Sequence, residues 1–399
     1  MGSGSANARY RDHGGRLDAS ARKRQLAEEA ARQFHRYGFH RVALSDVANA
    51  VGITAPAVYR HFRNKKALLA GAISGGLDVV DSAFGDELAL DQLLVSLTGA
   101  AVERRDVWVL LQRELRHLDA VDRAPIQARF ADFVGRLAGR VQAERVDAEE
   151  GQVALSVTAA LGALSSPATH DLGLPSKEYR RWLAAAAVAA CRADLPVSSA
   201  FPADAAADVL TAQTRSRSDM VLDTAIALFH EHGYAGVSLD DIGAAVGMAG
   251  PSVYYHFSSK SELLVTAFTH ATQWLAINRE GLARNAAAGP TLQDVVHQYV
   301  DFAVRRRHLF GVYVTEVINL PPDAARRIKD ALDADVADWS AALARQRPAL
   351  TEAARLVLVH AARSVVNDVV RIGKLHTRPG IRAELQAILD AVLSADVVG

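Results

Sequence analysis

The feature that most constrains this chain is a long internal repeat. Residues 34–69 match residues 229–264 without a gap at an offset of 195 positions, and seventeen of the thirty-six aligned residues are identical. A repeat this long indicates a duplicated domain, because the units of solenoid proteins recur every ~20–50 residues. A chain of 399 residues is also long enough for two domains, each with its own core. The sequence therefore predicts two homologous halves.

The composition favours helices in both halves. Half of the residues are hydrophobic but only 6% are aromatic, and the abundant alanine and leucine have high helix propensity, so we expect an all-α protein. Cys191, the one cysteine, is expected to be a buried small side chain in a reducing compartment. No run of about 18 uncharged apolar residues occurs and the N-terminus lacks the apolar segment of a signal peptide, so we expect a cytoplasmic location.

Charge is balanced over the chain but unevenly distributed between the copies. The chain holds 45 Lys and Arg against 45 Asp and Glu. Up to Lys66, thirteen basic residues stand against five acidic ones, whereas residues 215–264 hold three against six. A basic surface favours contact with nucleic acid. The first copy is therefore the stronger candidate for such a contact.

The repeated segment has the pattern of a helix-turn-helix. In the first copy we expect Ser20 to cap a helix that ends at Gly38, a short helix over residues 44–51, and a third helix capped by Thr54. Gly52 supplies the left-handed residue that the tight turn before the third helix requires. A fourth helix is expected from about Asn64.

A longer helical region follows each repeated head. In the first half we expect helices over residues 90–103, 107–117, 125–143, 152–164 and 177–193. The second half aligns there at an offset of 202, so seven residues are inserted, and the stretch ARNAAAGP predicts a longer loop near residues 279–290. Capping-box spacing of Ser238 with Asp241 and of Ser259 with Glu262 predicts well-defined helix starts in the second head. The expected divisions are a flexible basic arm at 1–19, a first helix-turn-helix domain at 20–75, a first helical body at 76–193, a linker at 194–214, a second helix-turn-helix domain at 215–270 and a second helical body at 271–399.

Several residues of the third helix are not needed to pack the core and are expected to form an exposed face. In a helix-turn-helix, this face is placed to enter the major groove of DNA. Lys65 in the first turn of the fourth helix opposes the helix dipole at a cost of about 0.3–1 kcal/mol, and a docked phosphate would reverse the sign. The simpler alternative is that these side chains cover the edge of the core and that Lys65 is solvated. The repeated spacing favours DNA contact. The residues of this face are Ala55, Ala57, Tyr59, Arg60, His61 and Arg63.

Both heads resemble the TetR family of bacterial transcriptional regulators. The signature is a Gly-containing turn and a recognition helix that ends in Val-Tyr-x-His-Phe before a lysine, here over residues 58–65 and again over 253–260. The resemblance implies an all-α fold with a DNA-binding head and a helical body that binds a ligand and dimerises. It implies DNA contacts by Thr54, Ala55, Pro56, Ala57, Tyr59, His61 and Lys65, and by Ala249, Gly250, Pro251, Ser252, Tyr254, His256 and Lys260.

The duplication departs from ordinary members of the family, which are homodimers of single units. The chain is similar to the tandem members of actinobacteria, such as the single-chain repressors of mycobacterial mammalian-cell-entry and lipid-catabolism operons. We expect residues 152–164, 177–193, 352–369 and 381–393 to form one intramolecular bundle, so that one chain acts as a pseudo-dimer. Because Arg60 is matched by Tyr255, the two heads are expected to bind an asymmetric operator.

Each body offers candidate ligand-binding residues, with more aromatic ones in the second. The resemblance implies a small, lipid-like effector that releases DNA, and no cofactor or metal is expected. The alternative is that these residues are ordinary core aromatics and satisfied polar groups. The candidates are Trp108, Gln112, Trp274, Tyr299, Phe302, Phe310, Tyr313, Glu316, His360 and Asn367.

The sequence supports two other functional classes less well than DNA binding. An enzyme is disfavoured because the sequence holds no Gly-x-Ser-x-Gly, phosphate loop or His-Glu-x-x-His motif. A ligand sensor or protein scaffold that has lost DNA binding in one or both heads is supported by the zero net charge alone, and the basic first head opposes it.

Overall fold

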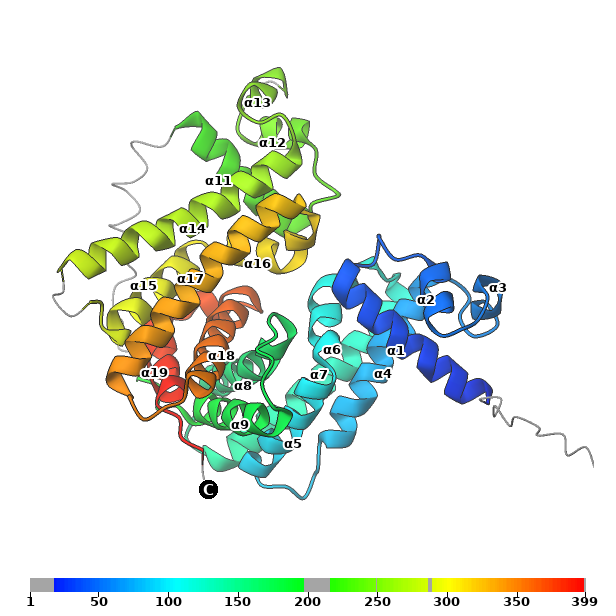
Figure 1. The fold of residues 1–399 in the computed structure, drawn as a ribbon, viewed down its shortest axis with the longest axis horizontal. Helices are drawn as coiled ribbons and strands as arrows, with labels where there is room; N and C mark the ends of the chain where they lie inside the picture. Colours follow the sequence, from blue (N-terminus) through cyan, green and yellow to red (C-terminus); the bar gives the residue numbers. More distant parts are fainter. Residues whose placement is uncertain (1–17, 197–215, 249, 286–288, 398–399) are drawn as a thin grey trace, which may run out of the picture.

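A computed structural model describes residues 18–196, 216–248, 250–285 and 289–397, and every regular element among them is a helix (Figure 1). The all-α prediction is therefore confirmed. Nearly all of the expected arm at 1–19 and of the linker at 194–214 lies outside the described residues. No helix in these ranges is both long and apolar enough to cross a membrane.

The first half contains a head, α1 to α4, and a body, α5 to α9. The elements are α1 Ala19–Tyr37, α2 Leu44–Ala50, α3 Ala55–Val58, α4 Lys65–Ala83, α5 Leu90–Glu103, α6 Arg105–Val109, the π-helical turn η1 Leu110–Glu114, the 3₁₀ turn η2 Leu115–His117, α7 Ala120–Glu144, α8 Glu150–Ser165, the 3₁₀ turn η3 Ser166–Ala168 and α9 Ser176–Arg192.

The second half repeats this order. Its elements are α11 Arg217–His232, α12 Leu239–Ala245, α13 Gly250–His256, α14 Lys260–Asn285, α15 Leu292–Arg305, α16 Arg307–Glu316, the 3₁₀ turn η4 Val317–Asn319, α17 Pro322–Gln346, α18 Glu352–Arg371, the 3₁₀ turn η5 Leu375–Thr377 and α19 Ile381–Leu393.

Helix caps differ from the sequence prediction at three ends. Thr54 stands at the N-cap position of α3, but its side chain makes no capping hydrogen bond. The N-cap of α1 is Asp18, whose carboxylate accepts from the backbone N–H of Ala21 at 2.7 Å, so the prediction of Ser20 was wrong. A carboxylate is the stronger acceptor for the free N–H groups of a first turn. The box at Ser259 is formed only in part, because the Glu262 carboxylate accepts from the N–H of Ser258 instead of returning to Ser259.

The seven inserted residues extend a helix and do not lengthen a loop. α14 has 26 residues where α4 has 19, and the segments that follow, 286–291 and 84–89, are equally long. The prediction of a longer loop at ARNAAAGP was therefore wrong. Seven residues are close to two turns of 3.6 residues each, so the extension preserves the phase of the helix.

The expected helix over residues 107–117 is divided into three pieces. The wide turn η1 carries Arg113 and Glu114, which are both buried. Arg113 donates to the carbonyl oxygens of Phe34 and His35 at 2.7 and 2.8 Å, and so supplies a donor to two of the last carbonyls of α1. The sequence predicts a continuous α-helix here because the apolar residues have helical spacing. The wide turn forms instead because it brings Arg113 to the end of α1, which is a contact between distant parts of the chain.

Each head has a core of its own, and the two bodies share a third. Within the described residues, one buried cluster joins α5, α8 and α9 of the first half to α15, α17, α18 and α19 of the second. The helices α8, α9, α18 and α19 pack against one another as the predicted intramolecular bundle. Asp368 of α18 crosses the junction, since it accepts from Ser165 at 3.1 Å and from Gln112 at 3.4 Å. The heads lie at separate ends of the molecule, with α3 and α13 outermost (Figure 1).

Candidate nucleic-acid interface

The recognition element of the first head is a short helix followed by a tighter turn. Gly52, with φ of +72°, joins α2 to α3, and Thr54 is the N-cap of α3. The helix ends at Val58, and the N–H of His61 donates to the carbonyl of Val58 at 2.9 Å. Tyr59, Arg60 and His61 therefore lie in the turn after the helix, whereas the sequence placed them within it.

The predicted contact face of the first head is open to solvent. Tyr59 is 57% exposed, and Thr54, Pro56, Arg60 and Arg63 are also exposed. Between them, Val58 and Phe62 are buried in the core of the head, which fixes the direction of the exposed side chains. The remaining predicted residues, Ala55, Ala57, His61 and Lys65, are half-buried.

The second head presents a similar face with more aromatic surface. Tyr254 is 53% exposed and Tyr255 is 88% exposed, while Ser252 is exposed and His256 half-buried. Gly250 and Pro251 lie in the first turn of α13, and Ala249 lies outside the described residues. An exposed tyrosine pair offers apolar and hydrogen-bonding surface without charge.

The repeated lysines are engaged within their own heads. The ammonium of Lys65 lies 4.5 Å from the ring centre of Phe39 and donates to the carbonyl of His40 at 3.4 Å. Lys260 repeats this, 4.6 Å from the Tyr234 ring and 2.6 Å from the Tyr234 carbonyl. Burial lowers the pKa of both lysines. The aromatic ring and the carbonyl therefore offset the unfavourable position of each lysine at a helix start. A bound phosphate is not needed to explain why a lysine stands there.

The two heads differ most in charge around the recognition turn. At equivalent positions the first head has Arg41, Arg60, Arg63 and Lys66, and the second has Gly236, Tyr255, Ser258 and Ser261. Two of these cations are held at the start of α7, since Arg63 pairs with Asp122 of its first turn and Lys66 with the N-cap residue Asp119, both at 2.6 Å. Both pairs lie at the surface and contribute little to stability.

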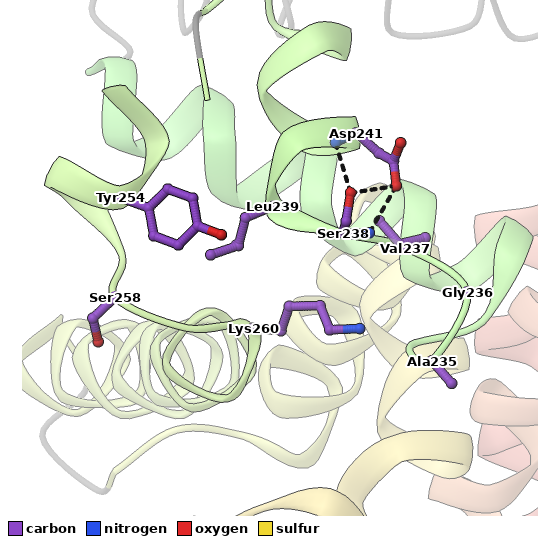
Figure 2. Close-up of a pocket in the computed structure, with 9 residues that line it drawn as sticks. All are labelled: Ala235, Gly236, Val237, Ser238, Leu239, Asp241, Tyr254, Ser258 and Lys260. Carbon is purple, nitrogen blue, oxygen red and sulfur yellow. Dashed lines mark hydrogen bonds between the residues drawn. The ribbon is translucent and has the colours of Figure 1, made fainter. Parts of the chain in front are cut away.

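An open pocket of about 430 Å³ occupies the corresponding edge of the second head. Figure 2 shows Tyr254, Ser258 and Lys260 around it, opposite the loop that leads to α12. Ser238 and Asp241 close the predicted capping box there, with the N–H of Ser238 donating to the carboxylate at 2.8 Å and the N–H of Asp241 donating to the hydroxyl at 3.1 Å (Figure 2). Gly236 and Ser258, which line the pocket, stand where the first head has Arg41 and Arg63.

In the second body, most of the predicted ligand residues form one aromatic cluster. The Trp274 and Phe302 rings stack with centres 4.5 Å apart, and Phe310 lies 5.8 Å from both Phe302 and Tyr299. Tyr299 donates to Asn367 at 2.8 Å. The side chain of Tyr313 packs edge-on against Phe268, at the base of the second head. The aromatic residues thus fill the body between α14 and α18 and reach the head.

A buried charged pair, missed in the sequence, completes this cluster. Arg363 is 8% exposed, lies 4.4 Å from the ring centre of Tyr299 and forms an ion pair with buried Asp335. Trp339 is fully buried beside them, 5.9 Å from the guanidinium. The sequence does carry a signal for this pair. At the offset of 202, Arg363, Asp335 and Trp339 align with Leu161, Phe133 and Leu137 of the first body.

Four predicted ligand residues lie elsewhere. Trp108 packs edge-on to Phe130 in the first body, and Gln112 donates to Asp368 across the junction. Glu316 pairs with an arginine of the first half. His360 stacks on His170 of the first half with ring centres 3.7 Å apart, and burial lowers the pKa of His360 to about 4. The last three contacts join the halves, and the role of these side chains in ligand binding stays a prediction.

Comparison with known proteins identifies the heads. The sequence model described as "Bacterial regulatory proteins, tetR family" matches residues 26–72 and again residues 221–267. The chain therefore carries two TetR-like heads. The matched ranges run from within α1 to within α4 and from within α11 to within α14, and they include the two recognition turns.

Curated relatives match the chain over a short segment. The biofilm operon icaADBC HTH-type negative transcriptional regulator IcaR of Staphylococcus aureus (strain Newman) is 49% identical over 45 residues, which are 11% of this chain and 24% of IcaR. The IcaR of Staphylococcus epidermidis is 47% identical over a segment of the same length. The chain thus spans about a quarter of the length of these relatives.

Solved structures of similar fold cover about one half of the chain. A TetR-family transcriptional regulator from Bordetella parapertussis 12822 has 18% identity and a TM-score of 0.41 over 46% of this chain and 96% of its own. The TetR-family regulator PfmR from Thermus thermophilus has 21% identity and a TM-score of 0.38 over 47% of this chain and 100% of its own.

Proposed function

We propose that this tandem TetR-like protein is a DNA-binding transcriptional repressor, and that one chain binds one asymmetric operator through its two heads. The observation that carries the proposal is the pair of exposed recognition turns, on Tyr59 and Tyr254, whose bodies share one core. A shared core places the second head at high effective concentration once the first has bound. The relative IcaR is described as a negative regulator, which supports repression.

The heads are proposed to contribute unequally. The arginines around the first recognition turn would supply most of the phosphate attraction, which dominates affinity for DNA. The second head, with Tyr254, Tyr255 and an open pocket, would add apolar contacts to thymine methyl groups and sensitivity to DNA shape. The DNA-contact residues predicted in the sequence, in both heads, belong to this proposal.

We also propose that the small, lipid-like effector binds in the second body. The first body buries Leu97, Phe133, Leu137 and Leu161 at the positions of Tyr299, Asp335, Trp339 and Arg363. A buried ion pair has a large desolvation cost, and the apolar first body indicates that the fold does not need one. The aromatic rings would cover an apolar chain, and the guanidinium would bind an acidic head group. The likeness to repressors of lipid-catabolism operons stays a prediction.

Alanine substitution of the two equivalent tyrosines tests the function. We expect Tyr59→Ala to weaken binding to the DNA upstream of the protein's own gene by about tenfold or more, or ~1.4 kcal/mol, and Tyr254→Ala to weaken it less. Gel shifts at several salt concentrations measure both losses. Tyr37→Ala is the control, because Tyr37 is an exposed tyrosine of the first head outside the recognition turn.

Each outcome of this experiment discriminates between models. Equal losses at the two tyrosines would contradict unequal heads. A loss confined to Tyr59→Ala would indicate that the second head does not bind DNA. No binding by the unsubstituted chain would favour the ligand-sensor alternative.

A further inference from the structure

The halves touch near the heads through a reciprocal pair of contacts. Gly38 ends α1 and Gly233 ends α11, both with positive φ. A Cβ at Gly38 would lie 2.9 Å from the Cδ1 of Ile318 in the second half, and a Cβ at Gly233 would lie 3.7 Å from the Nη1 of Arg116 in the first half. Residues 116 and 318 are equivalent at the offset of 202. The first helix of each head therefore ends against the body of the other half.

One ion pair joins the halves at this place. Arg116 Nη1 lies 2.5 Å from Glu316 Oε1, and Glu316 is 1% exposed. The other carboxylate oxygen, Oε2, accepts from Asn319 at 2.8 Å. The equivalent residue of the first half, Glu114, is also buried but pairs with Arg113 of its own half at 2.5 Å. A buried carboxylate requires such a partner, so Glu316 ties the second half to the first.

This contact lies on the side of the bundle that faces the heads. Glu316 is the last residue of α16, which packs against α11 of the second head and against α18 of the bundle. Arg116 lies in η2, four residues after the Gln112 that donates to Asp368 of α18. The bundle helices α8, α9, α18 and α19 lie away from the outer helices α3 and α13 (Figure 1). Two rigid bodies joined at one region rotate about it, and a further contact toward the heads restricts that rotation. The negative charge of Glu316 also acts on Lys260 of the second head. Burial lowers the pKa of Lys260, and the nearby charge of Glu316 raises it in part.

We propose that Arg116 and Glu316 are positioning residues that hold the two heads at one separation, and that breaking their contact frees the heads while the bundle stays closed. The pair acts through the placement of the heads and does not touch DNA. Its importance for operator binding rests on the function proposed above, but the separation itself is measured without DNA.

Spin labels on the two heads test the proposal. The exposed equivalent positions Asn49→Cys and Ala244→Cys take the labels in a full chain that also carries Cys191→Ala, which removes the buried native thiol. Double electron–electron resonance then gives the distribution of distances between the heads. We expect one narrow distribution in this parent chain, and a shifted and broadened one when Arg116→Ala is added.

Further variants separate loss of the contact from unfolding. Arg116→Lys keeps the charge and is expected to keep the narrow distribution. The double variant Arg116→Ala with Glu316→Gln leaves no uncompensated buried charge. We expect it to broaden the distance distribution as much as Arg116→Ala alone does. Arg279→Gln is the matched control, since it removes a 2.8 Å pair with Asp338 inside the second half. Circular dichroism on each variant reports the helical fold.

The proposal is overturned if folded Arg116→Ala keeps the parent distribution, because the bundle alone would then set the separation. It is also overturned if the double variant restores the narrow distribution, since the effect would then come from the buried charge and not from the lost contact. Equal broadening by Arg279→Gln would have the same consequence.

Discussion

Single residues in this chain are best understood by comparison with their equivalents in the other half. Lys65 and Lys260 occupy the same position and each lies over an aromatic ring of its own head, at 4.5 and 4.6 Å. The sequence interpretation treated them as phosphate ligands because a cation at a helix start is unfavourable. The ring and carbonyl contacts, which depend on the packing of the turn before α2 and α12, are not visible in the sequence pattern.

The same comparison predicts the energetics of the buried pair in the second body. Arg363→Leu alone leaves Asp335 buried without its partner, and we expect it to lower the free energy of unfolding by about 3–5 kcal/mol. Arg363→Leu with Asp335→Leu restores the apolar character of the first body and is expected to be neutral or stabilising by about 1–4 kcal/mol. Urea unfolding of the three chains measures this. If the double variant is as unstable as the single one, the pair is required by the fold, which removes the main support for an effector site.

At the scale of elements, the junction of the halves depends on the close approach of α8 and α18. A Cβ at Gly162 would lie 2.9 Å from the Cα of Val365 and 3.3 Å from the carbonyl oxygen of Ser364. These are backbone atoms of the partner helix and are held by its hydrogen bonds. A side chain at this position therefore has to push the helices apart.

We expect Gly162→Leu to destabilise the chain by about 1–3 kcal/mol or more through overpacking of this junction. The matched control is Gly139→Leu in α7, where an added Cβ has no atom within 4 Å. That change is expected to be neutral or slightly stabilising, because leucine has the higher helix propensity. Thermal unfolding monitored by circular dichroism compares the two. An equal effect of both substitutions would show that α8 and α18 are free to move apart.

Local patterns predicted most elements well. The helix expected over residues 90–103 is α5, and the helix expected over 381–393 is α19, because apolar spacing and end signals are both local. The extension of α14 was missed because an alanine-rich, glycine-containing stretch fits a loop or a helix equally. The turn η1 was missed because it forms around Arg113, whose partners on α1 are far away in sequence.

For the whole molecule, duplication predicted the architecture better than it predicted the site. Two halves with one internal bundle followed directly from the repeat and its offset, and they are present. Gln112, Glu316 and His360 each make a contact with the opposite half. Such contacts depend on how the halves pack and are not visible in the sequence of one half.

The stoichiometry on DNA is the most direct test of the account. The mass of the complex between the purified chain and the DNA upstream of its own gene would be measured at several salt concentrations. We predict one chain per asymmetric site, with an affinity that falls steeply as salt rises because phosphate contacts release counterions. Two chains on a palindromic site would contradict the account, since each chain would then supply only one working head.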